Sequence, residues 1–344
     1  MTARSRAASL LVRRIIGPVR LGHGLVMAAA LIIALVVVSL HPGGQGTQAE
    51  SSSVTTRVIP TALAAFDAQH LIVVGTSENN KTHGAMATSV DGGLAWSSKE
   101  LDTPPLNGVA ARGSTVIVTA DCANTNGPDC VWRSSDGGAS FVSLPGLPML
   151  VRPALADERT GWIMTPQVRG QGTTLWDTYD GGNTWAQTTP ECDLVARIFS
   201  TVSLSFPSVN EGWTTCVGSY SGGHEARVIV RSSATGSTRE TMSEVGGSAA
   251  TGSLPAEGEL HGMSMTTDGS GWLWTADQLY ATHDAGRTWT PVTRAGGSEQ
   301  RQIVEAVLVS HESGFAILAG GSSPTAAVTH DNGTSWESLS SFPA

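Results

Sequence analysis

The chain has 344 residues, a length that fits two or three small domains or one large all-β domain. Its 40 glycines make up about 12 % of the sequence against ~7 % in average proteins, while helix formers such as Lys and Glu are scarce, which argues against a large helical bundle. After residue 40 the chain holds 15 basic and 29 acidic residues, and this net charge of −14 argues against nucleic acid as a partner.

The N-terminus has the features of a membrane signal. Residues 1–20 carry five arginines and no acid, and residues 25–40 carry no charge, so that with residues 21–24 an apolar stretch of ~20 residues can span a bilayer. The arginines are expected to keep the N-terminus in the cytoplasm. The sequence therefore predicts a cytoplasmic segment at 1–20, a transmembrane signal anchor at 21–41, a flexible linker at 42–56 and an extracytoplasmic domain at 57–344. The alternative is a secretory signal cleaved near residues 47–49, which would release the domain.

The cysteine count agrees with export. The four cysteines are Cys122, Cys130, Cys192 and Cys216, and they show no CxxC or Cys/His spacing, so we expect no metal site. In an oxidising compartment the natural pairs are Cys122 with Cys130 and Cys192 with Cys216. Three pairings are formally open, and four buried free thiols are the alternative.

A motif of the form Ser/Thr-x-Asp-x-Gly-x-x-Trp/Phe recurs through the extracytoplasmic domain. Its aspartates are Asp91, Asp136, Asp180, Asp284 and Asp331. They are separated by 45, 44, 104 and 47 residues, so the long gap should hold a degenerate copy, which residues 232–238 fit with Ala234 in place of the aspartate. Six repeats of roughly 47 residues are typical of a propeller or solenoid.

Each motif has the chemistry of a tight hairpin between two strands. The glycine permits positive φ, the aspartate can accept backbone N–H groups of the turn, and the closing aromatic ring leads into the next strand. Gly-Trp or Gly-Phe pairs open an earlier apolar strand in four repeats, at Gly161, Gly212, Gly271 and Gly314. Each repeat thus parses into four antiparallel strands, which predicts an all-β, six-bladed β-propeller. Seven blades are the alternative if residues 50–60 add further strands.

These motifs and their spacing resemble the bacterial neuraminidase repeat, or Asp-box, propellers, which include sialidases, sortilin-type receptors and photosystem-assembly propellers. The resemblance covers roughly residues 60–340. In that family the boxes are peripheral structural turns. The resemblance therefore implies that the five motif aspartates are structural and not catalytic.

A sialidase-like enzyme needs three arginines around the substrate carboxylate, a tyrosine nucleophile activated by a glutamate, and an acid/base aspartate. The family's Arg-Ile-Pro signature is not matched, because two residues separate Arg57 from Pro60, and this segment is expected to precede the first blade. Tyr220, with Glu225 nearby, is the one candidate nucleophile, and no arginine triad accompanies it. No motif for a nucleotide, a metal or another cofactor occurs, so none is expected.

The irregular loops are expected on one face. The motif hairpin joins strands three and four of a repeat, so the loops between strands two and three, and those between repeats, emerge on the opposite side, hereafter the loop-rich face. These loops comprise residues 77–84, 121–130, 166–173, 188–200, 218–226 and 241–259. Because loops on a rigid scaffold often carry binding, we expect a non-catalytic module that binds or assembles an unidentified protein or glycan there. The alternative is a sialidase-like or other glycoside hydrolase with carboxylates at the propeller mouth.

The topology can be tested with a reporter that is active only outside the cytoplasm, fused after Ala344. Because the arginines of residues 1–20 hold the N-terminus inside, the fusion is expected to be active. The control is the same reporter fused before residue 1, which should be silent. A silent fusion after Ala344 together with an active fusion at the N-terminus would contradict export.

Overall fold

The computed structural model describes residues 56–120, 122, 130–165, 173–190, 192, 200–221, 224–233, 239–245, 254–255, 258–292, 301–320 and 324–339. For residues 200, 219–221, 224–225, 239 and 243–245 only the backbone is described. All of these residues belong to one compact unit, Ser52–Ala344. The predicted segments 1–20 and 21–41 and all of the linker 42–56 except Thr56 lie outside them. Within the described part of the chain, no helix has the length and apolarity needed to cross a membrane.

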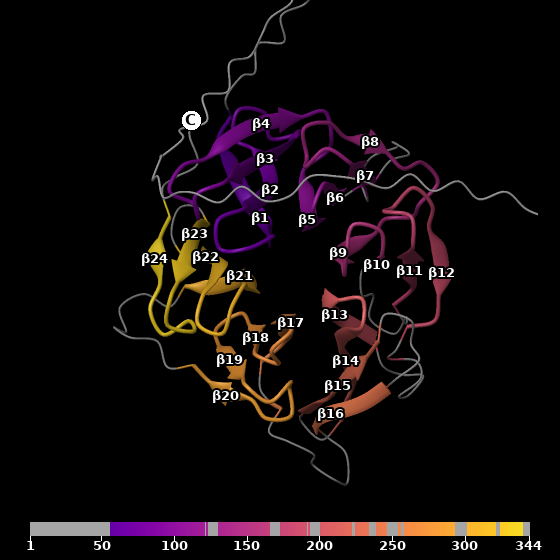
Figure 1. Cartoon of the computed structure of the whole chain (residues 1–344), viewed down its shortest axis with the longest axis vertical. Coiled ribbons are helices and arrows are strands. Elements are labelled where there is room, and N and C mark those ends of the chain that lie inside the picture. The colour runs from indigo at the N-terminus through magenta and orange to yellow at the C-terminus, as the bar shows by residue number, and fades with distance from the viewer. Residues whose placement is uncertain are drawn as a thin grey trace, which may run out of the picture. The chain divides into compact units, whose positions relative to one another are not determined.

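Six four-stranded antiparallel sheets, here called blades 1 to 6, follow one another along the chain (Figure 1). Blade 1 contains β1 (Val58–Ala65), β2 (Leu71–Ser77), β3 (Gly84–Ser89) and β4 (Ser97–Leu101); blade 2 contains β5 (Leu106–Arg112), β6 (Thr115–Ala120), β7 (Val131–Ser134) and β8 (Val142–Ser143). Blade 3 contains β9 (Val151–Leu155), β10 (Gly161–Met164), β11 (Leu175–Thr178) and β12 (Ala186–Thr188); blade 4 contains β13 (Ser200–Ser208), β14 (Glu211–Ser221), β15 (His224–Ser232) and β16 (Arg239–Val245). Blade 5 contains β17 (Leu260–Met265), β18 (Gly271–Thr275), β19 (Leu279–Thr282) and β20 (Thr290–Pro291); blade 6 contains β21 (Gln302–Leu308), β22 (Gly314–Ala319), β23 (Thr325–Thr329) and β24 (Glu337–Ser338).

The six blades close into a ring. The first strands of successive blades contact one another in the order β1, β5, β9, β13, β17 and β21, and β21 returns to contact β1. The predicted all-β six-bladed propeller is therefore confirmed, and the seven-bladed alternative is wrong. Residues 58–60 do form a strand, but they belong to β1, so this segment lies inside blade 1 and not before it as expected.

Packing between the faces of adjacent blades forms the core. The second strands are mostly buried because both of their faces are covered, as in β6, where every residue from Thr115 to Ala120 is buried. Blade 3 packs on blade 4 through Trp162 and Phe206, whose rings stack with centroids 3.8 Å apart. The ring closes in the same way, since Val73 of blade 1 and Ile317 of blade 6 belong to one apolar cluster.

Two disulfides lie toward the loop-rich face. Cys122 is bonded to Cys130, and Cys192 is bonded to Cys216, with Cα atoms 5.6 and 5.4 Å apart. The predicted pairing is confirmed, and the alternative of free thiols is wrong. The first bond spans the connection from β6 to β7, and the second ties the connection between blades 3 and 4 to β14.

Two of the predicted loops are partly strand. Within 218–226, residues up to Ser221 belong to β14 and residues from His224 belong to β15, so the hairpin of blade 4 extends as a ladder where a loop was expected. Likewise, β16 runs to Val245 within the predicted loop 241–259. Alternation is weak in both stretches, which is why their pattern did not predict strands.

Candidate functional site

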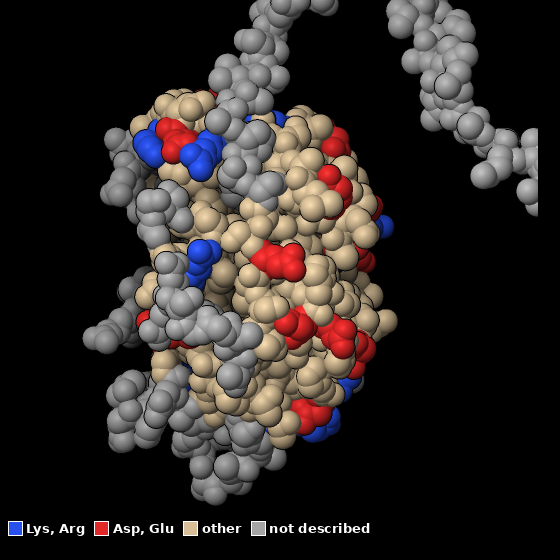
Figure 2. Space-filling model, turned by 90° about the vertical axis from the view of Figure 1, so that its left-hand side faces the viewer, with Lys and Arg blue, Asp and Glu red and all other residues tan. Residues whose placement is uncertain are grey.

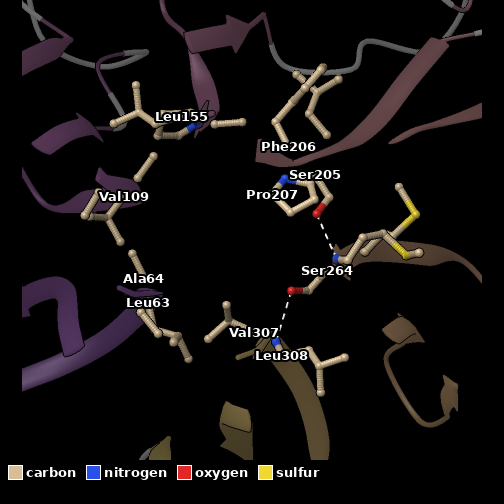
Figure 3. A pocket seen from close by; sticks show the side chains of 18 of the residues that line it. Leu63, Ala64, Val109, Leu155, Ser205, Phe206, Pro207, Ser264, Val307 and Leu308 are labelled. Atoms are coloured by element: carbon tan, nitrogen blue, oxygen red, sulfur yellow. Dashed lines mark hydrogen bonds between the residues drawn. The ribbon is translucent and has the colours of Figure 1, made fainter. Parts of the chain in front are cut away.

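The first strands of the six blades line a central cavity of about 440 Å³ (Figure 3). The side chains of Leu63, Val109, Leu155 and Val307 point toward it, while polar atoms make up more of its exposed wall than apolar atoms do. Small-molecule sites in proteins combine apolar contacts with a few placed polar groups, and this cavity offers both. The cavity is hereafter called the channel.

Hydroxyl groups fasten neighbouring channel strands to each other. The backbone N–H of Met265 donates to Ser205 Oγ at 2.8 Å, and the N–H of Leu308 donates to Ser264 Oγ at 3.0 Å (Figure 3). On the other side of the ring, Thr61 Oγ1 donates to the carbonyl of Leu106 at 2.6 Å. These bonds satisfy main-chain groups at the edges of the first strands, where no further strand follows, and so hold the channel wall rigid.

The described residues that line the channel include three charged side chains, Arg112, Arg152 and Glu305. Arg112 ends β5, and it donates from Nη1 to the carbonyl of Ala111 at 3.2 Å. Burial lowers the pKa of Arg112, although the group stays cationic. Arg152 is the second residue of β9 and Glu305 is the fourth of β21, and each is the first residue of its strand to line the channel, on the side nearer the loop-rich face.

Both strands that carry this charged pair, β9 and β21, have a β-bulge beside the charged residue. In β21 the register with β22 shifts between Ile303 and Glu305, so Glu305 directly follows the bulge. In β9 two residues, Arg152 and Pro153, stand opposite one residue of β10, and Arg152 has a φ of +51°. That left-handed backbone is normally taken by glycine at such bulges, so an arginine there is strained by ~1 kcal/mol or more.

Burial dominates the ionisation of Glu305. Removal from water raises its pKa to about 7, and the charge of Arg152 and the N–H of Ala306 only partly oppose this rise. A carboxyl group in such surroundings is a candidate functional group, because its charge is poised at neutral pH. It is the only carboxyl group among the described residues lining the channel.

The five motif aspartates do not converge. Each caps its own hairpin between strands three and four of blades 1, 2, 3, 5 and 6. The Ser or Thr hydroxyl donates to Oδ1 at 2.7–2.9 Å and accepts the glycine N–H at 2.8–3.0 Å, while Oδ1 also accepts the N–H four residues later at 2.8–2.9 Å. The carboxylates are thus engaged locally, on the face opposite the loops.

These hairpins also join one blade to the next. Lys99 of blade 1 donates from Nζ to the carbonyl of Gly138, in the motif of blade 2, at 2.6 Å. Trp213 of blade 4 donates from Nε1 to the carbonyl of Ala285, in the motif of blade 5, at 2.8 Å. In each motif turn two successive residues have positive φ, and a main-chain carbonyl of the turn points outward. The preceding blade donates a hydrogen bond to that carbonyl in these two turns, so the motif helps to assemble the ring. The degenerate copy at 232–238 lies mostly outside the described residues, between β15 and β16.

The candidate pair Tyr220 and Glu225 lies on the extended hairpin of blade 4. The backbone register places Tyr220 directly opposite Glu225 across β14 and β15. The side chains of both residues lie outside the described part of the chain. Their proposed chemistry therefore stays a prediction.

A polar network organises the described loop 77–84 on the loop-rich face. Ser77 Oγ donates to Glu100 Oε2 at 2.6 Å, and His83 Nδ1 lies 3.3 Å from Glu100 Oε1. Thr56 Oγ1 and Ser77 Oγ are 2.7 Å apart and buried, and they fix the entry of the chain into blade 1. Across the described residues, no cluster of His, Cys, Asp and Glu is arranged to hold a metal ion.

Sequence reasoning missed Arg112, Arg152 and Glu305. Comparison of the six repeats could have singled out two of them, Arg152 and Glu305. Next to the bulge of the first strand the other blades have small residues, Ala62, Gly108, Ser203 and Gly262, whereas blades 3 and 6 have a charged side chain. Only the closed ring shows that these two positions share one channel.

No model of a known protein family matches the sequence, and no curated protein matches it either. Among solved structures, the β-propeller domain of the trilobed protease from Pyrococcus furiosus is similar, with 10 % identity, a TM-score of 0.50, and coverage of 84 % of this chain and 99 % of that one. The GH74 xyloglucanase from Xanthomonas campestris has 12 % identity and a TM-score of 0.50 over 80 % of this chain and 45 % of its own. YCF48 bound to D1 peptide has 15 % identity and a TM-score of 0.47 over 81 % of this chain and 95 % of its own. Such identities speak to the propeller fold alone.

The motif carboxylates can be tested at Asp180, where the N–H and hydroxyl of Thr184 lower the pKa to about 2. Asp180→Ala is expected to lower the free energy of unfolding by about 1–2 kcal/mol, because turn donors lose their acceptor. The stabilisation by the ionised carboxylate is present above the unfolded pKa of ~4 and is lost as pH falls toward 2. Urea unfolding at pH 7 and pH 3 measures both effects.

Asp180→Asn is the matched control, because it keeps the oxygen that accepts from Thr184 N–H. It should lose less stability at pH 7 than Asp180→Ala does. Equal stability of Asp180→Ala and the unsubstituted protein at pH 7 would contradict a structural role for the carboxylate.

Proposed function

We propose that this chain is an Asp-box propeller that is anchored in the membrane by residues 21–41 and acts outside the cytoplasm as a non-catalytic binding or assembly module. The observation that carries the proposal is the single carboxyl group, Glu305, among the described residues of the channel. Glycoside hydrolases on such scaffolds use two carboxyl groups roughly 5–10 Å apart. The five motif carboxylates cannot supply the second one, since they cap turns in separate blades on the far face.

The partner, a protein or a glycan, binds at the loop-rich face in this proposal. Both disulfides constrain connections on that face, and the Ser77–Glu100–His83 network orders a further loop there. Crosslinked and hydrogen-bonded loops lose less conformational entropy when a partner binds, which favours affinity. The paired β-hairpin of blade 4 adds an ordered element to the same face.

A glycoside hydrolase is the second candidate function. Two observations favour it: Tyr220 and Glu225 stand opposite each other in the strand register, and Glu305 has a pKa near neutrality. A tyrosine nucleophile with a neighbouring glutamate is the arrangement that a sialidase-like reaction would use. The two functions differ in whether substrate is turned over.

Turnover is tested with the full-length protein in detergent and a panel of fluorogenic α- and β-glycosides that includes a sialoside. Because the described channel has no second carboxyl group, the rate of release is expected to equal that of the blank. Hydrolysis of any substrate that is abolished by Tyr220→Phe or Glu305→Gln, with melting temperature unchanged, would establish the enzyme instead.

Partner binding is tested by copurification of the full-length protein from its own membrane fraction. Lys81→Glu reverses a charge exposed in loop 77–84, whereas Arg159→Glu does the same in an exposed turn on the opposite face. A partner of the loop-rich face should be weakened by Lys81→Glu by about tenfold and be retained by Arg159→Glu. The reverse pattern would place binding on the motif face and refute the assignment.

A further inference from the structure

The charged pair Arg152 and Glu305 occupies opposite sides of the channel. The first strands follow one another in the order β1, β5, β9, β13, β17 and β21, so β9 and β21 are three blades apart and face each other across the ring. Both side chains line the channel on the side nearer the loop-rich face, and the charge of Arg152 acts on Glu305. The two groups therefore line the same cavity from opposite sides.

Neither charge is neutralised by direct contact with a described residue. No ion pair within 4.0 Å joins either side chain to another residue in the described part of the chain. Both side chains are half-buried, and a charge partly removed from water without a partner is destabilising. A pair held apart across a cavity leaves a guanidinium and a carboxyl group each able to take a partner.

The backbone at Arg152 gives a second, independent indication. Its φ of +51° within a bulge is a conformation that glycine adopts freely and arginine does not. Among the residues that the structure describes, three non-glycine residues have positive φ, and the other two, Ala285 and Asn332, lie in motif turns, where blades 1, 2 and 3 have glycine. Backbone strain of this kind is retained mainly where a side chain has a function to perform.

The sign of the charge in the channel differs from that of the exterior. Acidic patches spread over the surface visible in Figure 2, in keeping with the excess of acidic residues, whereas the described channel lining has two arginines and one glutamate. A cavity of about 440 Å³ admits a small organic molecule but not a folded partner. The channel thus suits a small ligand that carries an anionic group and a second group complementary to Glu305.

We propose that the channel binds a small zwitterion whose carboxylate contacts the Arg152 guanidinium and whose ammonium group contacts Glu305. Arginine grips a carboxylate through two parallel hydrogen bonds, and a carboxylate accepts charge-assisted bonds from an ammonium group. A plain anion would lie beside the carboxyl group of Glu305 with no positive charge to offset the repulsion, and a plain cation would be repelled by Arg152. This site goes beyond the proposed partner binding at the loop-rich face and does not depend on it.

The test is calorimetric titration of the full-length protein with three amino acids that differ in charge separation: glycine, 4-aminobutyrate and 6-aminohexanoate. At least one is expected to bind saturably. The acid and the amine of the same chain length, each lacking one charge, should bind at least about tenfold more weakly, since each loses one charge-assisted contact. Equal binding of the plain acid would show a general anion site and overturn the proposal, as would the absence of binding by all three up to about 10 mM.

Three variants locate the site. Arg152→Gly suits the positive φ, so it should melt at or above the temperature of the unsubstituted protein while binding at least about tenfold more weakly. Glu305→Gln keeps the size of the side chain and removes its charge, with the same expected loss. Arg112→Gln removes the other channel arginine and should leave affinity within about twofold. If Arg112→Gln weakens binding as much as Arg152→Gly does, the charge of the whole channel and not the Arg152–Glu305 pair is responsible, and the proposal fails.

Discussion

Packing between the flat faces of adjacent blades is the interaction on which the rest of the structure depends. A four-stranded sheet with apolar side chains on both faces cannot be stable alone, because each exposed Ile, Val or Trp would forgo ~1.5–3 kcal/mol of burial. Each blade therefore needs a neighbour on both sides, and only a closed ring supplies one to the first and last blades. The cluster that contains Val73 and Ile317 is this closing contact between blades 1 and 6.

Closure of the ring gives the propeller two faces that differ in structure, the face with the motif hairpins and the loop-rich face. One face carries the motif hairpins, whose carboxylates and hydroxyls satisfy the turns and whose carbonyls accept bonds from the preceding blade, as between Trp213 and Ala285. The opposite face carries the irregular connections and both disulfides. Assembly chemistry thus occupies one side, which leaves the other side and the channel free to vary without loss of the fold.

The channel is a consequence of the same closure. Six first strands meet around an axis, and their edges would expose unpaired main-chain groups if residues such as Ser205 and Ser264 did not accept bonds from the neighbouring strand. Besides blade 2 with Arg112, blades 3 and 6 introduce charge into this wall, at Arg152 and Glu305. Those side chains depart from the small residues found at the corresponding positions of other blades, so the fold does not require them, and a ligand is the simplest account of both.

The architecture could be predicted from the amino-acid sequence, because each part of it is a local structure repeated along the chain. The motif glycines and aspartates specify a hairpin within eight residues, Gly-Trp pairs such as Gly161-Trp162 begin buried strands, and the regular spacing gives the number of blades. The disulfide pairing also followed from proximity in sequence and was confirmed. The strand extensions of blade 4 were missed because backbone pairing in the hairpin, and not alternation of side chains, holds those residues in the ladder.

Which charged residues share a site could be seen only once the blades had closed into a ring. Arg152 and Glu305 are more than a hundred residues apart, and nothing local distinguishes either from a surface side chain. Their relation arises from the number of blades between β9 and β21, from the bulges that orient both strands, and from burial that raises the pKa of Glu305. The periodic sequence specifies each blade. The approach of Arg152 and Glu305 to one cavity on the ring axis follows only from closure of the six blades into a ring.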